Sequence, residues 1–295
     1  MCLTNSTACL DECIAANPNG QTKFEALFTC ADVACPASCA YGGFQPATCP
    51  AGMACVRIAD MIPDALAYDV CLKKGPLPPF GPLFAGASTS GGAIAYLEVS
   101  KLIAVAPDAY AIFVVKQGTS CASTIATTTA TLAAGETWEI VTYGLSAAPK
   151  IAAFRNDVQA TGKNITLREL SFVNTLPAPG TLDTGLWGGA SLSLVFHAGL
   201  AVATAATAGV NLDANGYNTV SLADLGVSGP KAQASWGALV HGTSTQVHVG
   251  FVDLDESTTG TLFHAGIFGS TAHPPLFLQC NDWLDAGDYN FCFGH

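Results

Sequence analysis

The hydrophobic pattern of most of the chain predicts a mainly β protein. Short apolar runs alternate with Gly, Pro and Asn breaks, as in domains built from strands and tight turns. The cleanest run is Gln246–Val252, where Val247, Val249 and Phe251 fall on one face and His248 falls on the other. The pattern predicts strands at Val56–Ala59, Tyr68–Leu72, Ala93–Val99, Tyr110–Lys116, Thr124–Leu132, Thr137–Tyr143, Ile151–Phe154, Leu167–Val173, Leu192–His197, Gly216–Leu222, Ala234–Val240, Gln246–Val252 and Thr261–Phe268.

The first 54 residues have a different pattern, which predicts a small helical hairpin laced by disulfides. Two pairs of cysteines are each spaced one helical turn apart, a turn sequence lies between the pairs, and an apolar stripe at helical spacing follows that turn. These features are Cys9 with Cys13, Cys35 with Cys39, the turn Asn17–Gly20, and the stripe of Phe24, Leu27 and Phe28. A unit this small needs cross-links because its own core is too small.

Three short matches recur in the same order at a nearly constant offset, which predicts two tandem copies of one fold. They pair Val56–Pro63 with Leu170–Pro177, Asp108–Tyr110 with Asn215–Tyr217, and Arg155–Asp157 with Cys280–Asp282. We therefore expect a cysteine-rich cap over 1–54, an immunoglobulin-like β-sandwich over 55–160 and a second β-sandwich over 161–295. In a superposition of the copies, Pro63 should fall on Pro177 and Tyr110 on Tyr217.

The same residues resemble the bacterial domain-of-unknown-function family 4397. Val56–Val70 has that family's apolar strand, then Pro-Asp-Ala, then a strand ending in Asp-Val, and Pro107–Ile112 and Leu132–Trp138 are similar to its middle strands. The second copy keeps Phe172–Asn174 but has Pro177–Pro179 in place of Pro-Asp-Ala. The resemblance covers most of both copies and implies an exported bacterial protein with β-sandwich repeats. It points to no catalytic residue, because none is established for the family. The leader is similar to those of large secreted myxobacterial proteins.

The 12 cysteines indicate an oxidising compartment. No Cys-x2-Cys pair occurs, and no histidine precedes His197, so a zinc knuckle is not expected among the early cysteines. Cys71 ends a predicted strand and Cys121 follows another strand of the same copy, so these two should bond. Cys280 and Cys292 should close the C-terminal tail. Cys49 and Cys55 are expected to close a short loop, and the pairing within the leader stays open among Cys9, Cys13, Cys30, Cys35 and Cys39.

Charge narrows the classes of partner. Only 11% of residues are charged, against about 25% in ordinary soluble proteins, so the surface suits burial against other copies or partners. The net charge is −11 and the basic residues are scattered, which excludes nucleic acid and anionic membrane as partners. No apolar run approaches the roughly 20 residues of a membrane span. Because Met1-Cys2 leads directly into polar residues, we expect the numbering to start at a mature or truncated end.

Several residue sets have compositions that sites use, and each also has a simpler interpretation. Asn211–Gly216 is similar to half of a calcium loop, but Leu222 occupies the place of the acidic twelfth ligand, so a turn is the alternative. The acidic cluster and the histidines of the second copy suit carboxylate chemistry or a metal, but equally a solvated loop and surface strands. The tryptophans suit a sugar platform or core packing. These sets are Asp253 with Asp255 and Glu256; His197, His241, His248, His264 and His273; and Trp138, Trp187, Trp236 and Trp283.

No Gly-x-Ser-x-Gly nucleophile elbow and no phosphate-binding Gly loop occurs in the sequence. The sequence therefore predicts a non-enzymatic extracellular or cell-surface structural protein, a self-assembling subunit of a fibre or surface layer, with no cofactor and no metal. The alternative is a secreted module that binds a carbohydrate or protein. Expected partners are other copies of the chain, through uncharged strand edges at Ala93–Val99 and Ser123–Leu132, and a surface glycan or protein. The stretch Gly75–Gly92 is expected to run over the surface as a linker.

Overall fold

A computed structural model describes residues 49–65, 67–84, 93–100, 102–156, 164–205, 212–226, 231–255, 259–283 and 291–294. We call the part up to residue 156 the first unit and the part from residue 164 the second unit. Most of the expected helical cap over 1–54 lies outside the described residues. The mainly β class is confirmed, because every regular element of the described chain is a strand. Among these residues, no helix is long and apolar enough to cross a bilayer.

Strands of the first unit follow closely the apolar runs of the sequence. They are β1 (Ala54–Asp60), β2 (Tyr68–Lys74), β3 (Ile103–Val105), β4 (Asp108–Lys116), β5 (Thr124–Leu132), β6 (Thr137–Leu145) and β7 (Ala148–Arg155). Those of the second unit are β8 (Asn164–Asn174), β9 (Thr181–Trp187), β10 (Leu192–Ala201), β11 (Tyr217–Ser221), β12 (Lys231–Val240), β13 (Gln246–Asp255), β14 (Thr259–Ile267), β15 (Leu276–Trp283) and β16 (Phe291–Gly294).

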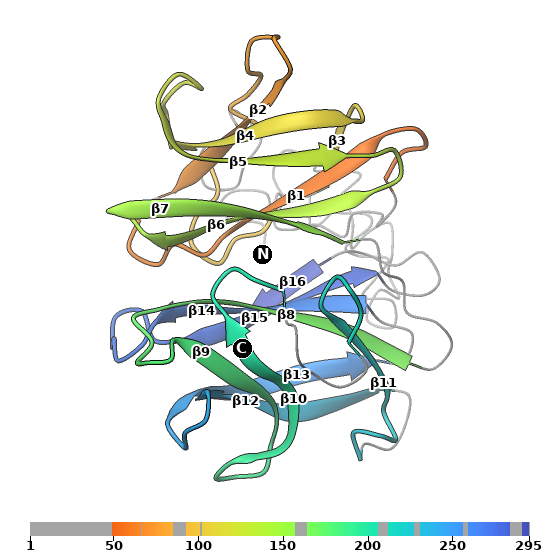
Figure 1. Cartoon of the computed structure of the whole chain (residues 1–295), viewed down its shortest axis with the longest axis vertical. Coiled ribbons are helices and arrows are strands. Elements are labelled where there is room, and N and C mark those ends of the chain that lie inside the picture. Colours follow the sequence, from red (N-terminus) through yellow and green to blue (C-terminus); the bar gives the residue numbers. More distant parts are fainter. Residues whose placement is uncertain are drawn as a thin grey trace, which may run out of the picture.

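The strands form sheets that stack as four layers along the long axis of the molecule (Figure 1). The first unit contributes an outer sheet of order β2-β4-β5 and an inner sheet of order β3-β1-β6-β7. The second unit contributes an inner sheet of order β11-β8-β14-β15-β16 and an outer sheet of order β10-β9-β12-β13. Each sheet draws its strands from one unit only, so each unit is a two-layer sandwich of its own.

The two inner sheets share one topology. β1 runs parallel to β6 and antiparallel to β3, and β8 likewise runs parallel to β14 and antiparallel to β11. Pro63 and Pro177 each lie three residues beyond these equivalent strands, as the sequence match predicts. The match of Tyr110 with Tyr217 is wrong. Tyr110 lies on β4 of an outer sheet, whereas Tyr217 opens β11, whose equivalent by sheet order is β3.

Apolar side chains fill the spaces between successive layers. Within the first unit, Val56, Ile58 and Ile140 of the inner sheet pack on Val70 and Ile112 of the outer sheet. A separate cluster lies between the two units, where apolar side chains of the two inner sheets meet face to face. Its buried members are Ala59, Met61, Val141, Leu170, Phe172, Phe263, Ala265, Leu278 and Cys280. The two sandwiches are therefore joined by a shared core.

Two predicted features of the first unit differ in the structure. Ala93–Val99 is not a strand: Ile94 bridges to Tyr68 of the outer sheet and Val99 bridges to Ala59 of the inner sheet, so the segment crosses between layers. The described part of the expected linker also does not run free. Phe80 pairs with Leu72 at the edge of β2. Both segments pair with strands of their own chain, which leaves the edge of β2 covered.

Candidate functional site

The free edges of the sheets are where this chain can pair with another strand, and most are protected. β3, β11 and β16 have only 3, 5 and 4 residues. β10 is interrupted by register shifts along its length, β7 carries Pro149 and Lys150, and β13 carries Asp253. Short strands, bulges, proline and charge are the usual protections of edge strands against pairing with other molecules.

β5 has only one of these protections, an irregularity in its pairing with β4 between Thr124 and Ala126. Its nine residues contain no charged residue and no proline, and five of them, including the first, are threonine. From Ala126 to Leu132 its pairing with β4 is regular, and the other side of β5 has no strand in the sheet order. Alternate side chains such as Thr127, Thr129 and Thr131 are exposed. β5 is thus a long, uncharged, β-branched edge strand of the kind that accepts another strand.

A shallow depression of about 530 Å³ lies on the outward face of the same sheet. Its lining comes from β2, β4 and β5 and includes Lys73, Ala111, Phe113, Thr129 and Thr131. Lys73 is the only charged residue in that lining. The face beside the open edge is therefore mostly small and uncharged, which matches the low charge of the whole sequence.

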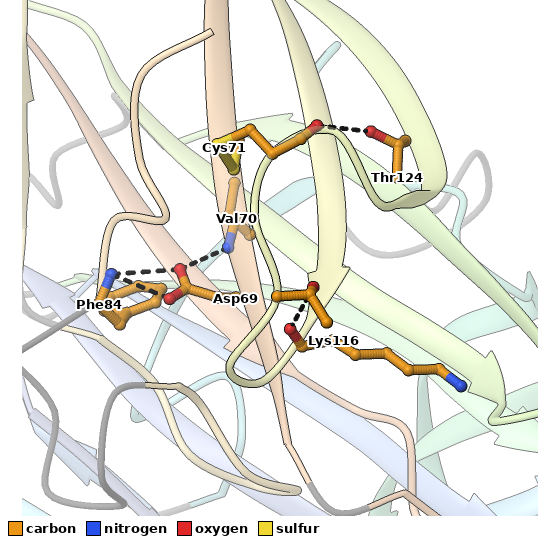
Figure 2. Close-up of a disulfide and its surroundings, with 8 residues drawn as sticks. Asp69, Val70, Cys71, Phe84, Lys116 and Thr124 are labelled. Carbon is orange, nitrogen blue, oxygen red and sulfur yellow. Dashed lines mark hydrogen bonds between the residues drawn. A yellow bond between two sulfur atoms is a disulfide. The ribbon is translucent and has the colours of Figure 1, made fainter.

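A disulfide fixes the start of β5. The Sγ atoms of Cys71 and Cys121 are 2.07 Å apart, so the predicted bond is present (Figure 2). The chain after Cys121 turns at once into β5, and Thr124 Oγ1 donates a hydrogen bond to the Cys121 carbonyl at 3.2 Å. Next to Cys71, Asp69 accepts hydrogen bonds from the backbone N–H groups of Val70 and Phe84. The disulfide thereby links the start of β5 to β2, and Asp69 links β2 to the segment around Phe84 that covers the edge of β2.

Of the other predicted disulfides, two can be placed. Cys49 and Cys55 are bonded, which closes the short loop before β1. Cys280 is disulfide-bonded and stands directly opposite Cys292 in the β15–β16 pair. The side chain of Cys292 lies outside the described residues. Those of the leader also lie outside them: Cys9, Cys13, Cys30, Cys35 and Cys39.

A buried polar network crosses the boundary between the units. Arg57 Nε donates to Glu139 Oε1 at 3.1 Å, and Asn156 Nδ2 donates to Glu139 Oε2 at 2.7 Å. On the other side, Asn156 Oδ1 accepts hydrogen bonds from Arg168 Nη2 and, at 2.9 Å, from Tyr217 Oη. The Arg168 guanidinium also lies 4.7 Å from the centre of the Tyr217 ring. All five side chains are buried or nearly so.

Inside the second unit, a chain of acid and imidazole groups crosses the core. Glu169 Oε2 lies 2.6 Å from His264 Nε2, and His264 Nδ1 lies 2.9 Å from His248 Nε2. Trp236 Nε1 donates to Glu169 Oε1 at 3.1 Å, and His197 Nδ1 lies 3.2 Å from the same oxygen. Apart from His248, which is 7% exposed, these side chains are fully buried. Three of the histidines predicted to lie on strand surfaces are therefore core residues.

Burial and close contacts shift the pKa values of two groups in this buried chain, Glu169 and His248. Burial alone would raise the pKa of Glu169, but its contacts with His197 and His264 outweigh that effect and hold the pKa well below its ordinary value. Burial, together with the charge of neighbouring His264, holds the pKa of His248 well below its ordinary value. Glu169 is thus ionised and His248 neutral in the folded protein.

A second perturbed carboxyl lies at the boundary between the units. Asp60 ends β1, and its Oδ1 accepts hydrogen bonds from Thr142 Oγ1 at 2.6 Å and from the Ile62 N–H at 3.0 Å. Its Oδ2 is buried without a hydrogen-bond partner. Burial raises the pKa of Asp60 to about 7, against the opposing effect of those two hydrogen bonds. Nearby, the Tyr96 ring of the first unit meets the His273 ring of the second at 6.2 Å.

The remaining sequence candidates do not come together. Asp213 Oδ1 accepts hydrogen bonds from the N–H groups of Asn215 and Tyr217, so the calcium-like stretch is a side-chain-capped turn where it is described. His241 pairs with Asp183 at 2.6 Å, away from His248. In the part of the chain that the structure describes, no group of three or more His, Cys, Asp or Glu side chains is arranged to hold a metal ion.

Among the side chains that the structure describes, neither the tryptophans nor the acidic residues of the cluster form a joint site. Trp236 is in the core and Trp187 lies on the outer sheet of the second unit, whereas Trp138 belongs to the first unit. Asp253 hydrogen-bonds to Gln233, and Glu256 lies outside the described residues. Sequence reasoning missed the Glu169–His264 contact, and the signal available for it was that each residue stands inside a predicted strand, Leu167–Val173 and Thr261–Phe268.

Comparison with known proteins gives no family. No protein-family model and no curated protein matches the chain. Among solved structures, it is similar to the product complex of SpuA, a multi-modular glycogen-degrading pneumococcal virulence factor, at 10% identity and a TM-score of 0.23, over 71% of this chain and 20% of that one. It is also similar to a streptococcal virulence factor described in α-glucan binding, at 9% identity and a TM-score of 0.23, over 71% of this chain and 92% of that one. A third similar structure is GBS52, the minor pilin of Streptococcus agalactiae, at 11% identity and a TM-score of 0.19, over 74% of this chain and 97% of that one. At these TM-scores, neither a fold family nor a function follows from the likeness.

Proposed function

We propose that this chain is a secreted structural protein of the cell surface whose copies associate through the edge of β5. The observation that carries the proposal is the contrast between β5 and the other free edges. Natural β proteins protect long edges, and among the described edge strands of this chain β5 is the long one with the least protection. A weakly protected edge in an otherwise protected molecule is consistent with pairing being used.

The rest of the molecule supports an extracellular, load-bearing role. The disulfides fit an oxidising compartment, and the shared core and buried network join both sandwiches into one stack. The net charge of −11 creates repulsion between copies, but only 11% of residues are charged, and physiological salt screens that repulsion beyond a Debye length of about 8 Å. The resemblance to family 4397, with its exported β-sandwich repeats, belongs to the same proposal.

The proposal is for a non-catalytic protein. The acid and imidazole groups that chemistry would need, Glu169 and His264, are fully enclosed by the second sandwich, where a substrate has no access to them. Glu139 is likewise occupied by Arg57 and Asn156. Buried groups that are satisfied by one another stabilise and specify a structure.

The test is to place charge on β5 and measure assembly. We expect wild-type protein to form larger species as its concentration rises, seen by sedimentation and as ordered particles by electron microscopy. The variant Thr127→Lys with Thr131→Lys should remain monomeric, because both residues are exposed and lysine blocks edge pairing. The matched control, Ala148→Lys with Gln246→Lys, adds the same charge to the protected edges β7 and β13 and should assemble like wild type. A wild-type monomer at all concentrations, or unchanged assembly of the β5 variant, contradicts the proposal.

A further inference from the structure

The outer sheet of the second unit has an unusual distribution of apolar side chains. Along β13, Val252 and Leu254 are in the core and Val247 packs against it, but the next two members of the alternating apolar set do not. Val249 is 37% exposed and Phe251 is 53% exposed, whereas His248 points inward to His264. A strand that buries a histidine and exposes a phenylalanine leaves a large apolar surface in contact with water, which is unfavourable unless a partner covers it. Such an exposed apolar set indicates a binding surface when it is contiguous.

Neighbouring strands make the exposed set contiguous. Ser235 of β12 pairs with Phe251, and Gly237 pairs with Val249 on one side and with Gly185 of β9 on the other. Because Trp236 and Ala238 point into the core, Ser235 and Gly237 face outward. We call the outward surface of Trp187, Ser235, Gly237, Val249 and Phe251 the aromatic face.

Gly237 makes room for the indole of Trp187. A Cβ at Gly237 would lie 2.5 Å from Trp187 Cε3, closer than real Cβ contacts allow, and 3.2 Å from Cδ2, which is a tight contact. The ring therefore leans over the strand at the place where a side chain is missing. Trp187 and Phe251 lie on strands on either side of β12, so their backbones are about 10 Å apart. The aromatic side chains of Trp187 and Phe251 therefore lie on the same sheet, with the hydroxyl group of Ser235 on the strand between them.

Polar groups at the rim define the chemistry of the ligand. Gln233 Nε2 donates to Asp253 Oδ1 at 3.2 Å, next to the row of Ser235 and Phe251. On the opposite side of the aromatic face, Asp183 of β9 pairs with His241 at 2.6 Å. Hydroxyl, amide and carboxylate groups hydrogen-bond with hydroxyl groups, and the two carboxylates repel an anionic ligand. Among the side chains described on this face there is no lysine or arginine to attract one.

We infer that the aromatic face binds a neutral carbohydrate. A sugar ring has apolar C–H faces that pack on aromatic groups and hydroxyls at its rim that match Ser235, Gln233 and Asp253. A second copy of the chain fits less well, because sheet stacking would bury the Asp183 and Asp253 carboxylates. This site is in the second unit and is independent of β5, so it adds a ligand to the proposed function without resting on it.

The test is native electrophoresis in gels that contain a polysaccharide. The probes are glycogen, a mixed-linkage β-glucan and mannan as neutral polymers, and polygalacturonate as an anionic one. We expect at least one neutral polymer to retard wild-type protein and polygalacturonate to have no effect. Phe251→Ala should weaken binding about tenfold, as loss of an aromatic contact does. Trp187→Ala and Gly237→Ala should weaken it too, the latter because the added methyl group displaces the indole.

Phe80→Ala is the matched control, since Phe80 is 43% exposed but lies in the first unit. It should bind like wild type, as should the β5 lysine variant, so failure of assembly and failure of binding are told apart. Melting curves identify any variant that does not fold. If Trp187→Ala or Gly237→Ala fails to fold, the binding of Phe251→Ala decides the test, because Phe251 is 53% exposed. The inference is overturned if no neutral polymer retards the protein, if the face variants bind like wild type, or if Phe251→Ala alters sedimentation without any polysaccharide binding.

Discussion

Asn156, the residue that follows the last strand of the first unit, accepts a hydrogen bond from Arg168 in the second unit. The same side chain donates to Glu139 at 2.7 Å. One carboxamide therefore connects the charged pair of one sandwich to the cation of the other. Because all of these groups are buried, the contacts exist only while the two inner sheets are packed together. This relationship predicts that the two units unfold together.

The first prediction concerns Arg168→Met. It removes the Arg168 donor from Asn156, which keeps only Tyr217 Oη as a donor to its Oδ1, and it removes the cation from the face of the Tyr217 ring. We therefore expect a loss of about 3 kcal/mol in the free energy of unfolding by urea. The single wild-type transition should separate into two. Arg155→Met is the control, because Arg155 is 45% exposed and its bond to Glu136 is superficial, so the change should be below about 1 kcal/mol. Equal losses for both variants would contradict a role of the network in coupling the units.

The second prediction concerns Asp60 and pH. Its folded pKa of about 7 lies above the ordinary value of 3.8, so the folded state holds a proton that the unfolded state has released. Its contribution to stability is therefore complete below about pH 4 and is lost as pH rises to 7. Asp60→Asn should stabilise the protein at pH 8 by up to about 4 kcal/mol and change little at pH 4. Asp108→Asn, at an exposed salt bridge, should give no such difference between the two pH values.

Much of the fold could be predicted from the pattern of the sequence. β5 was predicted with its observed ends because its β-branched residues and flanking turns leave no alternative. Pro63 and Pro177 were matched correctly because each follows a strand in the same local sequence. Tyr110 and Tyr217 were matched wrongly because Asp-Ala-Tyr and Asn-Gly-Tyr are both turn-then-strand sequences, and such a signal carries no information on which sheet the strand joins.

The candidate surfaces were harder to predict, for a physical reason. The alternation along β13 was found, but which side faces the core depends on contacts made with β14. His248 is held inside by His264, a residue that follows it by 16 positions, and this places Phe251 outside. Likewise, the open edge of β5 follows from the sheet order, a non-local property. The position of a strand follows from its local sequence, whereas the face that packs on the core and the edge that stays unpaired depend on residues far along the chain.

The third prediction concerns acid. His248 is neutral in the folded protein, while an unfolded histidine takes up a proton as pH falls through about 6.5. Glu169 is ionised in the folded protein, and its contribution is present above about pH 4.5 and lost at lower pH. His248→Leu should therefore reduce the loss of stability between pH 7 and pH 5, whatever its effect at pH 8. Val249→Leu, at an exposed position of the same strand, changes no titratable group and is the control; it should leave this pH dependence unchanged.

The last prediction compares the two described disulfides of the first unit. Cys71–Cys121 closes a loop with a sequence separation of 50, and Cys49–Cys55 closes one with a separation of 6. If the bonds act by restricting the unfolded chain, replacing the first pair by serine should cost about 4 kcal/mol and the second about 2 kcal/mol, because the entropy of loop closure grows with the logarithm of loop length. Urea unfolding of the two double variants measures both values.

A second readout separates entropy from local structure. Cys71–Cys121 also anchors the start of β5, so its loss should expose the backbone N–H groups of that strand to faster hydrogen exchange, beginning near Thr124. The protection of β1 next to Cys55 should be unchanged in the same variant. If the cost is the same for both pairs and exchange in β5 is unaltered, the long-range bond neither constrains the unfolded chain nor fixes the edge strand. The edge must then be held by its pairing with β4 alone.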